Sequence, residues 1–338
     1  MFRSIFTTLR SFAKLQLAIL QVDMAAPNST EDRHQKRFED FTCSPDLTTE
    51  LHGQLKFLSV LNSFMSATSF LGNALLLIAL RKESSLHPPS KLLLRTLATT
   101  DLCVGIFAEP LAVTFWMSVV RENWSICRHA LVTSFITGYI LCGVSVGTLT
   151  AISVDRLLAL LLGLRYRQVV TLKRTYVIVI AFWFLLAVFS AMYFWSPRIT
   201  FWYGIINISL CLTISIFSYT KIFYTLRHHQ NQVQGHFQQP SQTNQLHIGR
   251  YKKAVFTAIW LQLTLVACYL PYGIVDALRL KSGLSSSVYL AYSCTITLVF
   301  LNSLLNPILY CWKLDEVRQA VKDTIRQVLC FCCSSCPL

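Results

Sequence analysis

Two acidic positions inside long apolar stretches are the first candidates for chemistry in this sequence. In "AISVDRLLALLL", residues 151–162, Asp155 and Arg156 place an acid beside a base. Asp101 lies alone in "LATTDLCVG". A charged side chain at the centre of a membrane helix costs about 2.5–3.5 kcal/mol, so each such residue calls for a functional hypothesis. The chemistry that these residue types suggest is ion pairing, ion binding or switching.

A third polar set closes the last apolar run, in "NSLLNPILY". A proline inside a helix frees a backbone carbonyl and bends the helix. Neighbouring amide side chains can then satisfy the polar groups that are freed. The residues of this set are Asn302, Asn306, Pro307 and Tyr310.

The other reactive residues indicate neither catalysis nor a structural metal site. No C-x-x-C pair recurs with the spacing of a zinc site, and the eight histidines are scattered without a ligand pair inside an apolar run. An enzyme within the membrane would need a nucleophile with a base, or a pair of metal ligands. We therefore expect no enzymatic activity and no cofactor.

The composition shows which elements must position these residues. Of the 338 residues, 54% are hydrophobic and 14% are charged, and the mean hydropathy is +0.49. Soluble proteins carry about a quarter charged residues, so lipid is the expected solvent for most of this chain. The net charge of +14 lies in short segments between apolar runs. That distribution fits the positive-inside rule rather than a nucleic-acid-binding face.

Seven apolar runs are long enough to cross a bilayer, which takes about 20 mostly apolar residues in a helix. The sequence therefore predicts an all-α membrane protein, a seven-transmembrane helix bundle over residues 57–312. A transporter or channel is the alternative, but it would show inverted repeats or broken helices, and no such repeat is visible. The runs cover residues 57–80, 92–117, 129–161, 175–195, 199–226, 254–278 and 287–312.

Lysine and arginine in the short loops set the expected orientation, with the N-terminus outside. Residues 1–56 then form an extracellular segment, with glycosylation acceptors at Asn28 in "APNST" and at Asn123 in "ENWS", in the first outer loop. The first 23 residues read either as a weak signal or transit-like segment or as sequence upstream of a start at Met24.

The last segment, residues 313–338, is expected on the cytoplasmic side. Its first part has apolar residues at helical spacing with lysine and arginine between them, which predicts a short amphipathic eighth helix on the inner leaflet. The cysteines that follow are candidates for palmitoylation, with an unmodified thiol-rich tail as the alternative. They are Cys330, Cys332, Cys333 and Cys336.

Taken in order, the motifs resemble those of rhodopsin-like (class A) G-protein-coupled receptors over about residues 55–335. The resemblance implies a plasma-membrane receptor that activates a heterotrimeric G protein when an extracellular ligand binds. It also implies arrestin and receptor kinases as partners, beside membrane lipid. The residues that carry it are Asn73, Asp101, Asp155-Arg156-Leu157, Trp183, Tyr219, Pro271 and Asn306–Tyr310.

The resemblance also implies two internal sites. One is a sodium site for the resting state, whose matching residues are Asp101, Ser145, Asn302, Ser303 and Asn306; the alternative is a water-filled polar cluster. A hard cation prefers such oxygen ligands. The other is a switch in which Arg156 leaves Asp155 for the G protein while two tyrosines fill the gap, here Tyr219 and Tyr310.

The ligand pocket departs from the family's pattern. Gly138 stands where amine receptors carry an aspartate, and Tyr269 replaces the family's tryptophan. The ligand is therefore expected to be a small molecule or peptide, and not an amine bound by a third-span aspartate. Glu109 and Asp276 are the acids left near the outer half. Either could pair with a cationic ligand, or simply reach the headgroup region.

The family normally joins the outer end of the third span by a disulfide to the loop after the fourth span. Here that outer loop is short, and its residues "SPRIT" include no cysteine. The resemblance leaves Cys43 as the partner of Cys127. The short loop resembles melanocortin, cannabinoid and lysophospholipid receptors. The segment "LRYRQVVTLKR" resembles the second inner loop of melanocortin and adenosine receptors.

Overall fold

Long helices follow the predicted apolar runs, because a helix satisfies its own backbone hydrogen bonds where lipid offers none. The computed structural model describes residues 42–82, 86–236, 260, 263–279, 285–313, 318–319, 321–323 and 326. Residues 263–279 are helical, as are the elements α4 (His52–Lys82), α5 (Pro88–Cys103), η3 (Val104–Ala108), α6 (Glu109–Val120), α7 (Trp124–Leu162), α9 (Leu172–Ala191), α10 (Pro197–His236) and α12 (Ser286–Lys313).

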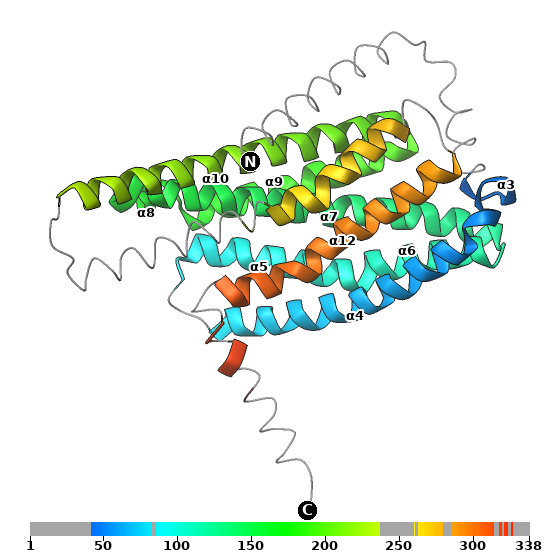
Figure 1. Cartoon of the computed structure of the whole chain (residues 1–338), viewed down its shortest axis with the longest axis horizontal. Helices are drawn as coiled ribbons and strands as arrows, with labels where there is room; N and C mark the ends of the chain where they lie inside the picture. Colours follow the sequence, from blue (N-terminus) through cyan, green and yellow to red (C-terminus); the bar gives the residue numbers. More distant parts are fainter. Residues whose placement is uncertain are drawn as a thin grey trace, which may run out of the picture.

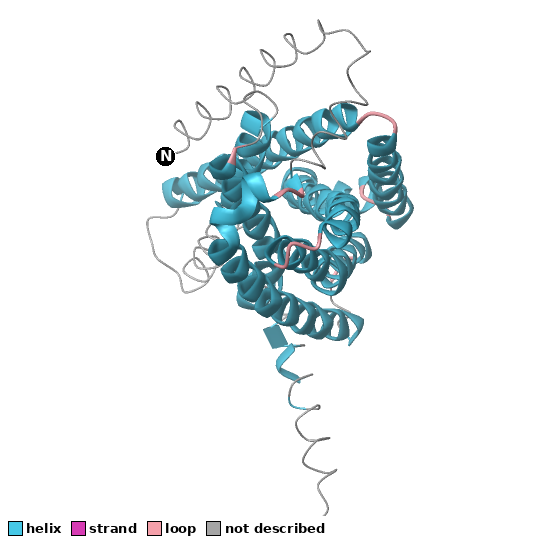
Figure 2. Cartoon of the chain, turned by 90° about the vertical axis from the view of Figure 1, so that its right-hand side faces the viewer, coloured by secondary structure: helices cyan, strands magenta, loops and turns pink. Residues whose placement is uncertain are grey.

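These helices run roughly side by side in one bundle (Figure 1), and a view along them shows that they enclose a shared interior (Figure 2). Within the described residues, 6 helices are long and apolar enough to cross a membrane. Residues 263–279 are the described part of the predicted sixth span, whose beginning lies outside the described residues. The predicted seven-helix membrane bundle is confirmed.

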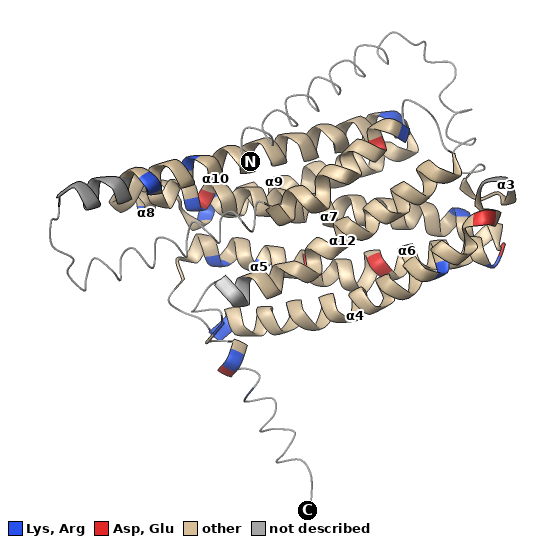
Figure 3. Ribbon diagram, viewed as in Figure 1, with Lys and Arg blue, Asp and Glu red and all other residues tan. Residues whose placement is uncertain are grey.

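The outer surface of the bundle is apolar. Phe64, Ile180 and Phe184 expose about two-thirds of their side chains, at 67%, 63% and 65%. Exposed aromatic and aliphatic groups of this size fit a protein that has lipid around it, so the chain is a multi-pass membrane protein. Lysine and arginine gather toward the two ends of the bundle (Figure 3).

The helix α7 is the central element, since it packs against α5, α6, α9 and α10. The helix α4 packs against α5, α6 and α12 on the other side of the bundle. We call the two ends of the bundle the Arg156 end and the Cys127 end, after one residue near either end of α7. Asp101 lies between these ends on α5, near the start of η3.

The second span is not one regular helix. Its π-helical stretch η3 separates α5 from α6, and such bulges are frequent at functional sites. Gly105 allows it to approach α4, because a Cβ on Gly105 would lie 3.0 Å from the carbonyl oxygen of Ser66. Ser66 Oγ instead donates to the Gly105 carbonyl at 2.6 Å.

The segments around the bundle are short or partly described. At the Cys127 end, α3 (Pro45–Thr48) and η2 (Thr49–Leu51) precede α4, and Leu51 is buried in the core. The described residues 318–319, 321–323 and 326 are helical. Val321 packs on the core while Lys322 is exposed, as an amphipathic eighth helix requires.

Candidate functional site

Asp101 is the centre of a buried polar cluster between α5, α7 and α12. Its Oδ1 accepts hydrogen bonds from Ser145 Oγ and Ser303 Oγ, both at 2.9 Å. Its Oδ2 accepts from Asn306 Nδ2 at 2.7 Å. Both serines and the asparagine are almost fully buried. Three neutral donors therefore hold one carboxylate inside the bundle.

Asn302 belongs to the same region but leaves one atom unsatisfied. It is buried, and no described residue accepts a hydrogen bond from its Nδ2. The predicted sodium ligands thus lie in one region, and their carboxylate, hydroxyl and amide oxygens are the donors that a hard cation prefers. The residues present fit a sodium ion by the chemistry of their donor set. Among described residues, no group of three or more His, Cys, Asp or Glu could hold a metal.

Pro307 explains why Asn73 is buried beside this cluster. Proline has no backbone N–H, so the carbonyl of Ser303, four residues earlier, loses its partner within α12. Asn73 Nδ2 on α4 donates to that carbonyl at 3.0 Å. A Cβ on Gly72 would lie 3.1 Å from Pro307 Cγ, so glycine allows the two helices to meet. The proline bend and the Asp101 cluster are thereby joined.

Asp155 has more partners than Arg156 alone. Its Oδ2 lies 3.5 Å from Arg156 Nη2 and accepts a hydrogen bond from Ser90 Oγ at 2.8 Å. Its Oδ1 accepts from Tyr166 Oη at 2.6 Å. Asp155 is buried, whereas the Arg156 side chain is 43% exposed. The acid is fixed by α5 and α8 (Tyr166–Val169), while the base is half in solvent.

Of the two predicted switch tyrosines, the structure describes the side chain of Tyr219 but not that of Tyr310. Tyr219 of α10 is buried and packs with Leu157 and Ile222 in a small apolar cluster at the Arg156 end. Leu157 stands where the family carries an aromatic residue, and here it fills the space between α7 and α10. Tyr310 lies in α12, and its side chain is outside the described residues.

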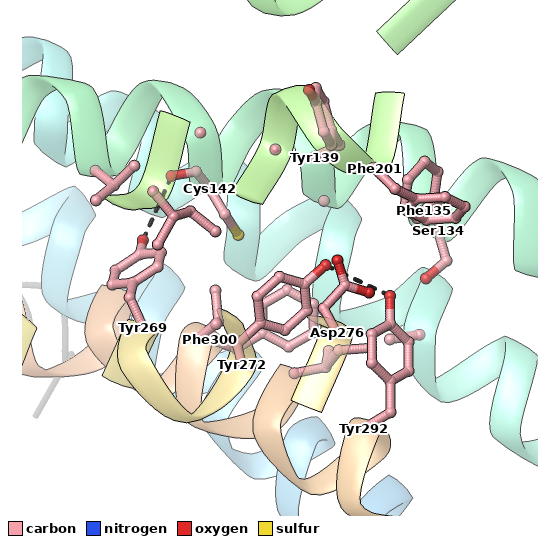
Figure 4. Close-up of a pocket in the computed structure, with 18 of the residues that line it drawn as sticks. Ser134, Phe135, Tyr139, Cys142, Phe201, Tyr269, Tyr272, Asp276, Tyr292 and Phe300 are labelled. Carbon is pink, nitrogen blue, oxygen red and sulfur yellow. Dashed lines mark hydrogen bonds between the residues drawn. The ribbon is translucent and has the colours of Figure 1, made fainter. Parts of the chain in front are cut away.

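A pocket lies toward the Cys127 end, between α7, α10, residues 263–279 and α12. Gly138, Tyr269 and Asp276 line it, and Glu109 does not. Its wall is mainly aromatic, and Figure 4 shows Phe135, Phe201, Tyr272 and Tyr292 around it. A mostly apolar cavity with a few convergent polar groups is the usual form of a ligand site.

Asp276 forms a buried ion pair in this pocket. Its Oδ1 accepts from Arg279 Nη2 at 2.6 Å and from Arg279 Nε at 3.1 Å. The side chains of Arg279 and Asp276 are only 5% and 4% exposed. The guanidinium carbon lies 4.3 Å from the ring centre of Phe201 and 4.7 Å from that of Tyr292. Arg279 follows the predicted sixth span, residues 254–278, and was therefore expected in an outer loop, but the structure buries it.

Gly138 and Tyr269 line the pocket on two different helices. A Cβ added to Gly138 would meet no atom within 4 Å, so open space lies where amine receptors carry their aspartate. Tyr269 is buried and donates to the carbonyl of Cys142 in α7 at 3.4 Å. This bond ties the helix of residues 263–279 to α7 (Figure 4).

Glu109 begins α6 and is fully buried away from the pocket lining. No described residue donates a hydrogen bond to either of its carboxyl oxygens. It therefore differs from Asp101, Asp155 and Asp276, each of which has polar partners.

The disulfide between Cys43 and Cys127 is present, with 6.0 Å between the two Cα atoms, so its prediction is confirmed. It ties the segment before α3 to the beginning of α7. The connection between η5 (Met192–Phe194) and α10 consists of Trp195 and Ser196 alone, and it carries no cysteine. The N-terminal segment thus supplies the bond that this loop cannot make.

The predicted modification sites are mostly beyond the described part of the chain. Asn123 is exposed, and its Oδ1 accepts from Ile126 N at 3.2 Å as the N-cap of α7. Its amide nitrogen, the atom to which a glycan would be joined, is not used by this cap. Asn28 and the four cysteines of the tail lie outside the described residues.

The sequence indicated the buried acids at these sites, but not all the residues that bond to Asp155 and Asp276. Ser90 and Tyr166 come from different segments than Asp155, and no spacing rule indicated them. Arg279 was within reach, since a residue three positions after Asp276 lies on the same face of a helix.

Comparison with known proteins agrees with this arrangement. Residues 72–198 and 191–310 match the family model described as 7 transmembrane receptor (rhodopsin family). The chain is 23% identical to the high-affinity lysophosphatidic acid receptor of Xenopus laevis, over 78% of this chain and 80% of that protein. It is 24% identical to adenosine receptor A3 of Canis lupus familiaris, over 74% and 85%.

A third relative, muscarinic acetylcholine receptor M3 of Rattus norvegicus, is 28% identical over 44% of this chain and 24% of that protein. The family model, in contrast, covers well over half of the chain, from the first span to the last. These relatives are receptors and not enzymes. The chain therefore belongs to the rhodopsin family of seven-transmembrane receptors, the class A G-protein-coupled receptors.

Proposed function

We propose that this protein is a plasma-membrane receptor that converts binding of an extracellular ligand into activation of a heterotrimeric G protein. Membership of the family supports a receptor with these two kinds of partner. One observation links the proposal to particular residues. The half-exposed Arg156 lies 3.5 Å from a buried Asp155 that other residues already hold.

The proposed orientation puts the N-terminus and the Cys127 end outside. Arg81, Lys82, Arg165, Arg167 and Arg174 all belong to the Arg156 end of the chain's described helices. An excess of lysine and arginine marks the cytoplasmic side of a membrane protein. The Arg156 end then faces the G protein, and the pocket opens toward the extracellular side.

The proposed switch depends on a difference between Asp155 and Arg156. Asp155 has other hydrogen-bond partners, whereas Arg156 is half-exposed. When Arg156 turns away, Asp155 keeps its hydrogen bonds from Ser90 and Tyr166, so no buried carboxylate is left bare. A half-exposed ion pair stabilises a structure by only about 0.2–1 kcal/mol. Arg156 is therefore released at small cost, and Tyr219 beside Leu157 is placed to pack against the opened helices.

A sodium ion is proposed as an allosteric modulator at the Asp101 cluster. Asp101, Ser145, Asn302, Ser303 and Asn306 would hold it. Bound there, the ion would supply a positive charge that none of the described residues around Asp101 supplies. In its absence the serine and asparagine donors hold the carboxylate directly.

The ligand is proposed to be a small molecule or peptide that binds between Gly138, Tyr269 and Asp276. The names of the three relatives refer to lysophosphatidic acid, adenosine and acetylcholine, which share little chemistry. Identity near one quarter does not choose among them. Gly138 speaks against an amine anchored on the third span, because no carboxylate stands there.

Further parts of the proposal lie at the two faces of the membrane. Glycans at Asn28 and Asn123 would mark the outer side. On the inner side, arrestin and receptor kinases are the proposed partners of the activated state, and lipid contacts the amphipathic eighth helix. The palmitoylation candidates are Cys330, Cys332, Cys333 and Cys336.

The test replaces Arg156 by alanine. Membranes with equal amounts of receptor are assayed for nucleotide exchange on purified heterotrimeric G proteins, first without ligand and then with amine, nucleoside, peptide and lipid libraries. We expect the wild type to accelerate exchange and Arg156→Ala to fall to the receptor-free rate. Arg121→Ala, which removes an exposed charge at the other end, should behave as the wild type. Undiminished exchange by Arg156→Ala would refute the switch.

A further inference from the structure

The Asp276–Arg279 pair is arranged so that one carboxylate oxygen is left over. The two hydrogen bonds that Asp276 accepts from Arg279 both end on Oδ1. No described residue donates to Oδ2, although the residue is only 3% exposed overall and lines the pocket. The carboxylate is therefore able to accept from a second donor inside the cavity.

The walls around this carboxylate suit a positive charge. The faces of Phe201 and Tyr292 already lie 4.3 Å and 4.7 Å from the guanidinium carbon of Arg279. The ring of Tyr272 lies 5.7 Å from that of Tyr292, and Figure 4 draws both hydroxyls beside the Asp276 carboxylate. Aromatic faces around an acid form the type of cage that binds ammonium and guanidinium groups.

The two members of the pair differ in their ability to leave. Arg279 is one helical turn nearer to the Cys127 end than Asp276. Its long side chain can turn outward and keep its charge in water. Asp276 is short and stays buried, and a buried charge without a partner is strongly unfavourable.

This asymmetry decides which ligand charge the pocket favours. An anionic ligand that took Arg279 would leave Asp276 buried and unpaired. A cationic ligand that took Asp276 would release Arg279 to water, and the pocket would stay neutral. Exchange of one cation for another is therefore the change that leaves no uncompensated charge inside the bundle.

We propose that the ligand carries an ammonium or guanidinium group that binds Asp276 between the rings of Phe201 and Tyr292, in place of Arg279. The open space at Gly138 receives the apolar body of the ligand, since a Cβ there meets nothing within 4 Å. This inference rests on the proposed function only in taking the pocket to be the ligand site. Release of Arg279 would also remove its contacts with Phe201 of α10 and Tyr292 of α12. Arg279 is on the helix whose Tyr269 is bonded to α7.

The experiment measures thermal unfolding of the purified full-length receptor in detergent with three matched probes. They are 3-phenylpropan-1-amine, which is cationic, 3-phenylpropan-1-ol, which is neutral, and 3-phenylpropanoate, which is anionic. We expect the amine to raise the melting temperature most and the anion not at all. In Arg279→Gln, the half-maximal amine concentration should fall about tenfold, as for a site that an internal competitor fills nine-tenths of the time.

Two further variants locate the charge that the amine meets. Asp276→Asn should lose the amine-specific shift. If that variant folds poorly, Asp276→Asn with Arg279→Gln removes both charges together and should fold while still giving no shift. Arg121→Gln, an exposed arginine at the same end, is the control and should titrate as the wild type.

Three results would overturn the proposal. A shift by the anion that Arg279→Gln abolishes would show that Arg279 is the anchor. Equal shifts by all three probes that survive Asp276→Asn would show recognition by shape alone. Absence of an amine-specific shift in Arg279→Gln, where the competitor is gone, would remove the cation site. None of these readings involves a G protein, so failure here and failure of the Arg156 switch are told apart.

Discussion

Asp101 and Asp276 are both buried carboxylates of one helix bundle, yet they are satisfied in opposite ways. Asp101 receives three hydrogen bonds from uncharged side chains on two other helices. Asp276 receives two from a single arginine one turn away on its own helix. The Asp101 site therefore holds a carboxylate with no positively charged side chain among the described residues bonded to it. At the second site, Arg279 on the same helix neutralises Asp276.

The difference indicates how each site can respond. At Asp101, a cation can be added without removing any protein charge, and the donors are serines and an asparagine whose oxygens can turn to it. At Asp276, a second cation beside Arg279 would leave an uncompensated positive charge inside the bundle, so exchange with Arg279 is the favoured way to enter. The first site is thus suited to a modulating ion, and the second to a ligand that competes with a tethered side chain.

The largest expected difference between the two sites is in stability. Asp101→Ala leaves three buried donors without an acceptor, and each unsatisfied buried group costs about 1–3 kcal/mol. We expect a loss of about 3 kcal/mol or more in the free energy of unfolding. Asp276→Ala removes the carboxylate partner of Arg279, whose side chain can turn to water, so a loss of about 1–2 kcal/mol is expected. Melting temperatures of the purified variants compare the two.

Asp276→Ala combined with Arg279→Ala sharpens this contrast. If the asymmetry is right, removing the arginine as well changes little, because in the single variant it has already left the interior. A double variant much more stable than Asp276→Ala would mean that Arg279 stays trapped. The exchange argument would then fail.

The helix bundle could be predicted from the sequence because each membrane span is recognisable from the hydropathy of its own residues. The Cys43–Cys127 bond was also predicted, since the loop that normally supplies the partner is too short and has no cysteine. The partners of the buried acids were not predicted. Ser90 and Tyr166 reach Asp155 from two other segments, and only packing of helices distant in sequence brings them there.

Arg279 shows a second reason for such misses. Counted with the loops, it was one positive charge among several on the outer side. Whether it reaches water or Asp276 depends on how its side chain packs among the other helices, including the rings of Phe201 and Tyr292 beside it. The local amino-acid composition does not determine this packing.

Two glycines test whether the sites also differ in free space. A Cβ on Gly105, beside the Asp101 region, would lie 3.0 Å from the Ser66 carbonyl and 3.1 Å from the Phe70 amide nitrogen. Both are backbone atoms, so Gly105→Ala should destabilise by about 1–3 kcal/mol, as overpacking does. Gly138→Ala meets open space and should be neutral or stabilising by about 0.5 kcal/mol. Equal melting temperatures would contradict the contrast.

The last comparison of the two sites concerns sodium. An ion that binds only the folded receptor stabilises it by about 1.4 kcal/mol at ten times its dissociation constant. Melting temperatures in sodium chloride and in N-methyl-D-glucamine chloride at equal ionic strength should therefore differ for the wild type. Asp101→Asn should abolish the difference, because an amide brings no negative charge to the cation. Asp276→Asn is the matched control and should keep it, since its carboxylate already has Arg279. Loss of the sodium response in both variants would mean that the two acids act as one site, and the distinction between an ion that is added and a cation that is exchanged would no longer hold.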